Sequence, residues 1–131
     1  MTDNALSRVL HVDDESDIRE VARLALEEVG GFAVESCASG AQAIEKAPSF
    51  GPDVILLDVM MPGMSGPEVL EALRGRPETA EIPVIFMTAK VQASEIEALR
   101  KLGAIGVIEK PFDPMTMSGQ VAEIWDRHVV R

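Results

Sequence analysis

Acidic residues stand directly after two apolar segments of this sequence. Asp13 and Asp14 follow the largely apolar residues 9–12, and Asp58 follows residues 54–57. Carboxylates that lie close together repel one another unless a cation compensates for their charge. Mg²⁺ is the natural cation, because it prefers oxygen ligands and keeps several of its waters. The three acids therefore predict a magnesium site, provided that the fold brings them to one place.

Two further polar residues follow apolar segments in the same way. Thr88 follows residues 84–87, and Lys110 comes shortly after residues 106–108. A dication, an ammonium, a hydroxyl and a carboxylate together suit phosphoryl transfer, in which positioning and charge neutralisation supply most of the catalysis. A carboxylate can also be the nucleophile and form an acyl phosphate. Asp58 is the best candidate nucleophile, because its segment is apolar at every position and no acid adjoins it.

Short apolar segments alternate with stretches of helical periodicity along the whole chain. The predicted strands are Val9–Val12, Ala33–Cys37, Val54–Leu57, Val84–Met87 and Gly106–Ile108. The predicted helices are Ser16–Val29, Ser39–Ala47, Pro67–Arg74, Ser94–Leu102 and Pro114–Val129. We expect Ser16 or Asp17 to cap the first helix and Pro48 to end the second. Strands that alternate with helices favour a parallel sheet, and ligands gather at the carboxyl ends of such strands.

Composition sets further limits on the class of protein. With 131 residues, 47% of them hydrophobic, the chain fits one domain with a hydrophobic core. No output domain is expected after the fifth helix. A formal charge of −10 disfavours nucleic acid and anionic membranes as direct partners. The single cysteine excludes an internal disulfide framework. Without a signal peptide or a long apolar run, the protein is expected to be cytoplasmic.

Four segments, in this order and at these spacings, strongly resemble the receiver domains of two-component response regulators. They are residues 9–15, 58–66, 87–90 and 110–112. The resemblance extends over about residues 5–128. It implies an α/β, flavodoxin-like (CheY-like) fold, a three-layer αβα sandwich with a five-stranded parallel sheet in the order 2-1-3-4-5.

The resemblance also implies a role for each candidate residue. Asp58 would accept a phosphoryl group from a histidine kinase or a histidine phosphotransferase, and Thr88 and Lys110 would bind the phosphoryl oxygens. The implied Mg²⁺ ligands are the side chains of Asp13, Asp14 and Asp58 and the backbone carbonyl of Met60. The peptide bond between Lys110 and Pro111 would be cis.

Phosphorylation would add negative charge to a crowded acidic pocket and draw Thr88 toward the new oxygens. The fourth helix, fifth strand and fifth helix would then rearrange and bind or release a partner protein. One position departs from the family pattern. Many receivers have Tyr or Phe where this chain has Val107, so no aromatic ring can turn inward there on activation. Met60 borders the path of hydrolytic water, and its apolar side chain is predicted to slow self-dephosphorylation.

Other interpretations of these residues remain open. The acids after the first strand would also suit a helix N-terminus. A phosphorylation-independent adaptor would keep the fold but would not need the intact set of site residues. A phosphatase that acts on outside substrates needs a second acid two residues after its nucleophile, where this chain has Met60, so we expect no such enzyme. His11 lacks a ligand companion and is expected to be packed or partly exposed in the first strand. The protein is expected to be a monomer or a weak homodimer.

Overall fold

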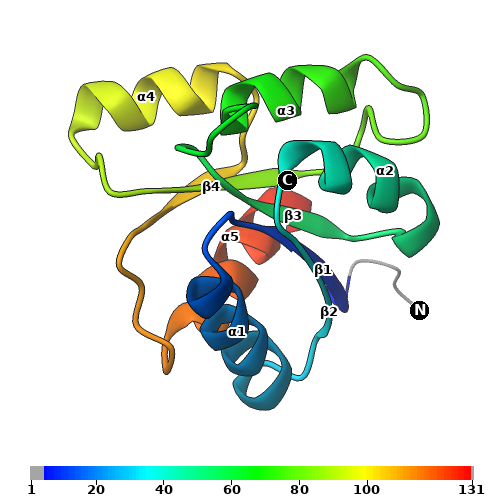
Figure 1. Cartoon of the computed structure of the whole chain (residues 1–131). Helices are drawn as coiled ribbons and strands as arrows, with labels where there is room; N and C mark the ends of the chain where they lie inside the picture. The colour runs from blue at the N-terminus through cyan, green and yellow to red at the C-terminus, as the bar shows by residue number, and fades with distance from the viewer. Residues whose placement is uncertain (1–4, 131) are drawn as a thin grey trace.

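The computed structural model describes residues 5–130, which form a central sheet covered by helices (Figure 1). All strand pairs are parallel, and the strand order is β2-β1-β3-β4-β5. The strands are β1 (Arg8–Val12), β2 (Ala33–Cys37), β3 (Val54–Asp58), β4 (Val84–Thr88) and β5 (Gly106–Glu109). The predicted fold class and strand order are confirmed.

Helices lie on both sides of the sheet. Figure 1 shows α1 and α5 on one side and α2, α3 and α4 on the other. Their bounds are α1 (Ser16–Leu24), α2 (Gly40–Phe50), α3 (Gly66–Arg74), α4 (Ala93–Lys101) and α5 (Met117–Val130), and a π-helical turn, η1 (Ala25–Val29), continues α1. None of the helices within residues 5–130 is long and apolar enough to cross a bilayer.

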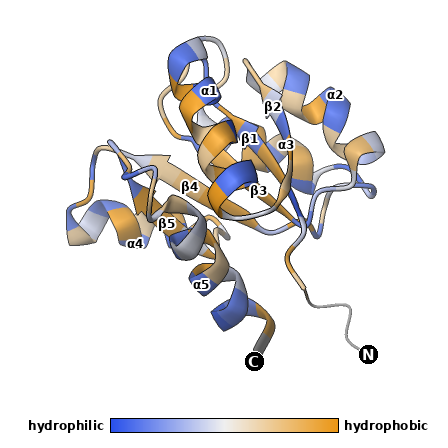
Figure 2. Ribbon diagram, turned by 90° about the horizontal axis from the view of Figure 1, so that it is seen from below, coloured by the Kyte–Doolittle hydropathy of each residue, from blue (hydrophilic) through white to orange (hydrophobic). Residues whose placement is uncertain are grey.

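The two faces of the sheet bury separate apolar cores. Every residue of β3 and β4 is buried, as expected for central strands covered on both sides. Because side chains alternate along a strand, Val54 and Leu56 pack toward α1 and α5, whereas Ile55 and Leu57 pack toward α2 and α3. Figure 2 shows the apolar strands between helices whose outward residues are hydrophilic. Trp125 belongs to the core on the side of α1 and α5, so α5 is docked on the sheet as predicted.

The first helix begins differently from the prediction. Its N-cap residue is Glu15, which makes no side-chain capping bond, and both Ser16 and Asp17 lie inside the helix. The prediction that one of these two residues caps α1 was therefore wrong. The structure instead uses the side chain of Asp13, which accepts the backbone N–H of Glu15 at 3.0 Å. An acid expected at the metal site thus also orders the start of the helix.

The second helix continues past its proline. We predicted that Pro48 ends α2, but the helix runs to Phe50 and ends at Gly51, whose φ is +66°. Pro48 lies in the last turn, where its missing N–H removes only one helical hydrogen bond. The N–H of Gly51 then donates to the carbonyl of Ala47 at 3.0 Å and closes the helix. The left-handed glycine, not the proline, sets this boundary.

Candidate functional site

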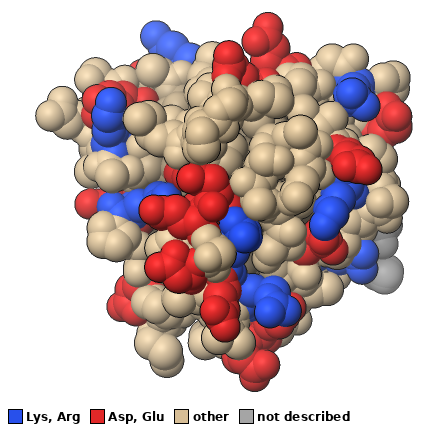
Figure 3. All heavy atoms as spheres, viewed as in Figure 1, with Lys and Arg blue, Asp and Glu red and all other residues tan. Residues whose placement is uncertain are grey.

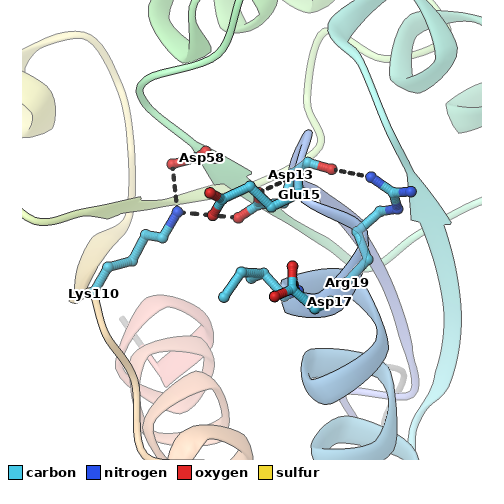
Figure 4. A network of polar contacts seen from close by, with 7 residues as sticks. Asp13, Glu15, Asp17, Arg19, Asp58 and Lys110 are labelled. Atoms are coloured by element: carbon cyan, nitrogen blue, oxygen red, sulfur yellow. Dashed lines mark hydrogen bonds and ion pairs between the residues drawn. The ribbon is translucent and has the colours of Figure 1, made fainter.

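The predicted site residues come from four neighbouring strand ends at one edge of the sheet. Asp13 follows β1, Asp58 ends β3, Thr88 ends β4 and Lys110 follows β5. Figure 4 shows the Lys110 side chain reaching toward the carboxylates of both Asp13 and Asp58. Parallel strands place their carboxyl ends together, which is why residues so distant in the sequence meet here.

Lys110 joins the two buried acids directly. Its Nζ lies 3.1 Å from Oδ2 of Asp13 and 3.2 Å from Oδ1 of Asp58. Asp13 has no exposed surface and Asp58 is only 3% exposed, so water screens these ion pairs little. The lysine is therefore held between the two carboxylates, and the predicted cluster of acids and ammonium is present.

Asp14 completes a set of oxygen donors. Carboxylate oxygens of Asp13, Asp14 and Asp58 all lie within 4.8 Å of one another, and Asp14 is exposed while the other two are buried. A small cation that enters from solvent could contact all three. Because every donor is a hard oxygen atom, the set fits Mg²⁺ rather than a metal that prefers sulfur or nitrogen.

The charges in the site are not balanced by protein alone. Burial raises the pKa of Asp58, and the negative charge of Asp13 raises it further, whereas Lys110 opposes both. Burial by itself lowers the pKa of Lys110, but hydrogen bonds and ion pairs with the two acids outweigh it, and the net pKa is raised. One ammonium thus faces three carboxylates. Figure 3 shows acidic side chains gathered near the middle of one face, beside several basic ones.

The backbone around Asp13 is fixed by three hydrogen bonds. Its N–H donates to the carbonyl of Cys37 at 3.1 Å, and its side chain accepts the N–H of Glu15. Its carbonyl accepts a hydrogen bond from Nη1 of Arg19 at 2.8 Å, visible in Figure 4. Sequence reasoning did not select Arg19, because an arginine on the polar face of an amphipathic helix carries no signal of such a contact.

The loop after Asp58 depends on Gly66, which ends the motif 58–66 but was given no role of its own by sequence reasoning. A Cβ atom added to Gly66 would lie 2.6 Å from the carbonyl oxygen of Asp58, so only glycine fits without a shift. The N–H of Gly66 donates to the carbonyl of Val59 at 2.9 Å. Ser65 and Glu68 form a capping box that begins α3 directly after this contact. The nucleophile candidate therefore lies at the start of a tightly closed loop.

Thr88 ends the strand that pairs with the strand of Asp58, and Met60 follows Asp58 by two residues. Thr88 is 3% exposed, and its Oγ1 accepts the N–H of Lys90 at 3.0 Å. No hydrogen bond joins Thr88 to Asp58 within residues 5–130. Met60 is 66% exposed. The bond between Lys110 and Pro111 is cis, as the family resemblance implied.

His11 lies beneath this site in the core. It is fully buried, and neither ring nitrogen has a hydrogen-bond partner among the described residues. Burial is the main reason that the pKa of His11 is lowered to about 4. Cys37 is also buried, and burial raises its pKa to about 11, so its thiol is not a nucleophile.

The model of the response regulator receiver domain family matches residues 9–122. This range is most of the chain and holds the whole acidic cluster, so the chain belongs to the receiver-domain family of two-component response regulators. The resemblance inferred from the four short segments is confirmed.

Named relatives agree with this assignment. The transcriptional regulatory protein CseB of Streptomyces coelicolor is 32% identical over 121 residues, which cover 92% of this chain and 50% of that protein. The response regulator MprA of Mycobacterium tuberculosis is 38% identical over 105 residues, which cover 80% of this chain and 44% of that protein. The chain therefore spans about half the length of these curated relatives.

Solved structures support the same fold. The chemotaxis protein CheY4 of Vibrio cholerae has a TM-score of 0.83 and 32% identity, over 92% of this chain and 99% of that one. A putative response regulator from Chloroflexus aurantiacus has a TM-score of 0.81 and 30% identity, over 94% of this chain and 100% of that one.

Proposed function

We propose that Asp58 accepts a phosphoryl group from the phosphohistidine of a histidine kinase or a histidine phosphotransferase. The observation that carries this proposal is the position of Asp58: its carboxylate is buried, bound to Lys110 and within reach of two further acids. An oxygen of Asp58 would form a bond to phosphorus while the bond from phosphorus to the donor imidazole breaks. The imidazole leaves with the bonding electron pair, and Asp58 becomes an acyl phosphate.

The surrounding residues have separate tasks in this step. Lys110 would stay charged and form ion pairs with the phosphoryl oxygens, which its raised pKa favours. Thr88 would donate its hydroxyl proton to one of them. Asp13, Asp14 and Asp58, with the backbone carbonyl of Met60, would hold Mg²⁺. When bound, this ion supplies the positive charge that three acids and a phosphoryl group require.

The chemistry is confined to the protein itself. Met60 stands two residues after Asp58, so an acid that protonates the leaving group of an outside substrate is missing there. We therefore propose a phosphoacceptor, not an enzyme that turns over other molecules. The intact set of acids, hydroxyl and lysine argues against an adaptor that works without phosphorylation. The net charge of −10 favours proteins over nucleic acid as direct partners.

The phosphoryl signal is proposed to reach the face formed by α4, β5 and α5. Thr88 lies in register with Glu109, and the N–H of Lys110 donates to the carbonyl of Thr88 at 2.9 Å, so a movement of Thr88 would be passed to the end of β5. Val107 is partly buried against the core beneath α4. Since it has no ring to reorient, this coupling would run through the backbone.

Intact-mass spectrometry tests the phosphoacceptor. The protein is incubated with Mg²⁺ and acetyl phosphate, alongside the variants Asp58→Asn and Asp126→Asn. Asp126 is exposed on α5, far along the chain from the cluster, so its variant is a matched control. We expect one added phosphoryl group on the wild type and on Asp126→Asn, and none on Asp58→Asn. Equal labelling of all three proteins would contradict the proposal.

A further inference from the structure

Strand β2 lies at one end of the sheet, and among the described strands it pairs with β1 alone. The N–H of Ala33 donates to the carbonyl of Ser7 at 2.9 Å, on the side of β1. Backbone groups alternate in direction along a strand, so Val34 and Ser36, one and three residues later, turn their N–H and carbonyl groups away from β1. These two donors and two acceptors form an outer edge that a further strand could join.

Hydrogen bonds at both ends limit this outer edge to a short stretch. The N–H of Phe32 donates to the carbonyl of Leu26 at 3.1 Å, which closes the edge just before β2. The N–H of Ala38 donates to Oε1 of Gln42 at 2.8 Å, which closes it just after β2. The open stretch therefore suits an extended segment of about three to five residues, near the lower limit for a strand.

A hollow of about 420 Å³ lies along the outer edge, between β2 and α1. Its lining includes Arg19, Glu20 and Arg23 of α1 and Val34, Glu35 and Ser36 of β2. A strand projects alternate side chains to opposite faces of a sheet. Every second side chain of a strand added beside β2 would therefore point toward this hollow.

The charges of the hollow favour an acidic side chain. Arg23 is exposed and makes no ion pair with any described residue. Arg19 is held in place, because its Nη1 donates to a backbone carbonyl at 2.8 Å (Figure 4). The carboxylate of Glu35 is already paired with Lys46 of α2 at 3.0 Å. Within the described part of the lining, two arginines thus stand against one unpaired carboxylate, that of Glu20, in a chain with a formal charge of −10.

We propose that β2 binds an extended segment of a partner protein, which adds to the sheet as a further strand and directs an acidic side chain toward Arg19 and Arg23. Main-chain hydrogen bonds with Val34 and Ser36 would supply the affinity, and the arginines would supply the preference for an acid. A second copy of this chain is disfavoured, because two proteins of formal charge −10 repel each other. The inference goes beyond the proposed function and does not depend on phosphorylation of Asp58.

Blocked peptides test the main-chain and charge contributions separately. The probes are acetyl-Thr-Val-Glu-Val-Thr-amide and its analogues with Gln or Lys in place of Glu. Two further analogues carry N-methyl groups, one on both Val residues and the other on Glu and the last Thr, so that each blocks one of the two edges of the peptide strand. Binding is followed by NMR, through amide shifts and hydrogen exchange of the protein. Arg23→Gln removes a cation of the hollow, and Arg76→Gln, exposed and outside the hollow, is the matched control.

We expect the Glu peptide to slow exchange of the Val34 and Ser36 amides and to leave Glu35 unchanged, because the N–H of Glu35 already faces β1. The Glu peptide should bind about threefold more tightly than the Gln peptide, as an exposed ion pair allows, and the Lys peptide should bind least. Arg23→Gln should lower this preference, whereas Arg76→Gln should keep it. One pattern of N-methyl groups should abolish binding and the other should not.

Unchanged exchange at Val34 and Ser36, equal binding of the Glu, Gln and Lys peptides, an unchanged preference in Arg23→Gln, or equal binding of both N-methylated peptides would overturn the proposal. So would a wild-type protein that sediments as a dimer and protects Val34 and Ser36 without peptide, because the occupant would then be a second copy. The measurements use unphosphorylated protein, and Asp58→Asn should give the same results. Failure of this test therefore leaves the phosphoacceptor standing, and failure to label Asp58 leaves the strand addition standing.

Discussion

The buried His11 gives a sharp prediction about stability and pH. Its ring is fully buried, and burial lowers its pKa from the ordinary value of 6.5 to about 4. Nearby charges have smaller effects: Asp13 raises the pKa, and Lys110 and Arg19 lower it. In the unfolded chain this histidine regains its ordinary pKa. The native and unfolded states therefore bind different numbers of protons over a defined range of pH.

Between pH 6.5 and about 4, the unfolded chain binds a proton at His11 that the native protein does not. Stability consequently falls as the pH drops through this range and is unaffected by His11 above it. The difference between 6.5 and about 4 is roughly 2.5 pKa units, and at 1.36 kcal/mol per unit it corresponds to about 3 kcal/mol.

Urea unfolding at several pH values measures this loss. His11→Leu removes the titrating group and keeps an apolar side chain in the core, while His128→Gln alters an exposed histidine as the control. Between about pH 7 and pH 4, the wild type and His128→Gln should each lose about 3 kcal/mol more unfolding free energy than His11→Leu. Carboxylates that titrate in the same range cancel in this comparison. If His11→Leu loses as much stability as the wild type, the reasoning about burial is wrong.

Three further predictions concern the site. Gly66→Ala should lower the unfolding free energy by about 1–3 kcal/mol, because its Cβ would press on the Asp58 carbonyl. Gly119→Ala should cause no loss in the same denaturation assay, because its added Cβ would meet no atom within 4 Å apart from its chain neighbours and the backbone of its own helix. Lys110→Met should raise the pKa of Asp58 further and slow labelling by acetyl phosphate. An unchanged labelling rate would contradict a role of the ion pair between Lys110 and Asp58 in phosphoryl transfer. Met60→Asn should shorten the lifetime of the acyl phosphate, measured by loss of the added mass. A wild-type lifetime of only seconds would contradict the prediction that Met60 slows hydrolysis of the acyl phosphate.

Much of the fold could be predicted because its determinants are local. An uninterrupted apolar run such as Val54–Leu57 specifies a central strand, and a left-handed glycine such as Gly31, with φ of +74°, specifies a helix end. The clustering of Asp13, Asp58 and Lys110 followed from strand ends that share one edge of a parallel sheet. The strand order itself came from the family resemblance, since no local pattern fixes which strands become neighbours.

The missed features depend on contacts between distant residues. The bond from Arg19 to the carbonyl of Asp13 requires the helix and the strand end to be oriented together, which periodicity does not reveal. The need for glycine at position 66 arises from the nearby carbonyl of Asp58, not from its own φ. The lack of partners at both ring nitrogens of His11 could not be read from a strand pattern either, because its neighbours come from other elements.

Locating the phosphoryl group on the labelled protein tests the proposed role of Asp58. The protein is labelled with acetyl phosphate and Mg²⁺, the acyl phosphate is reduced with borohydride, and peptides are sequenced by tandem mass spectrometry. Reduction of an aspartyl phosphate leaves homoserine, which marks the residue that was labelled. We expect homoserine at position 58 and nowhere else, and none when Mg²⁺ is removed with a chelator. Homoserine at position 13 or 14, or labelling that is unchanged without Mg²⁺, would contradict it.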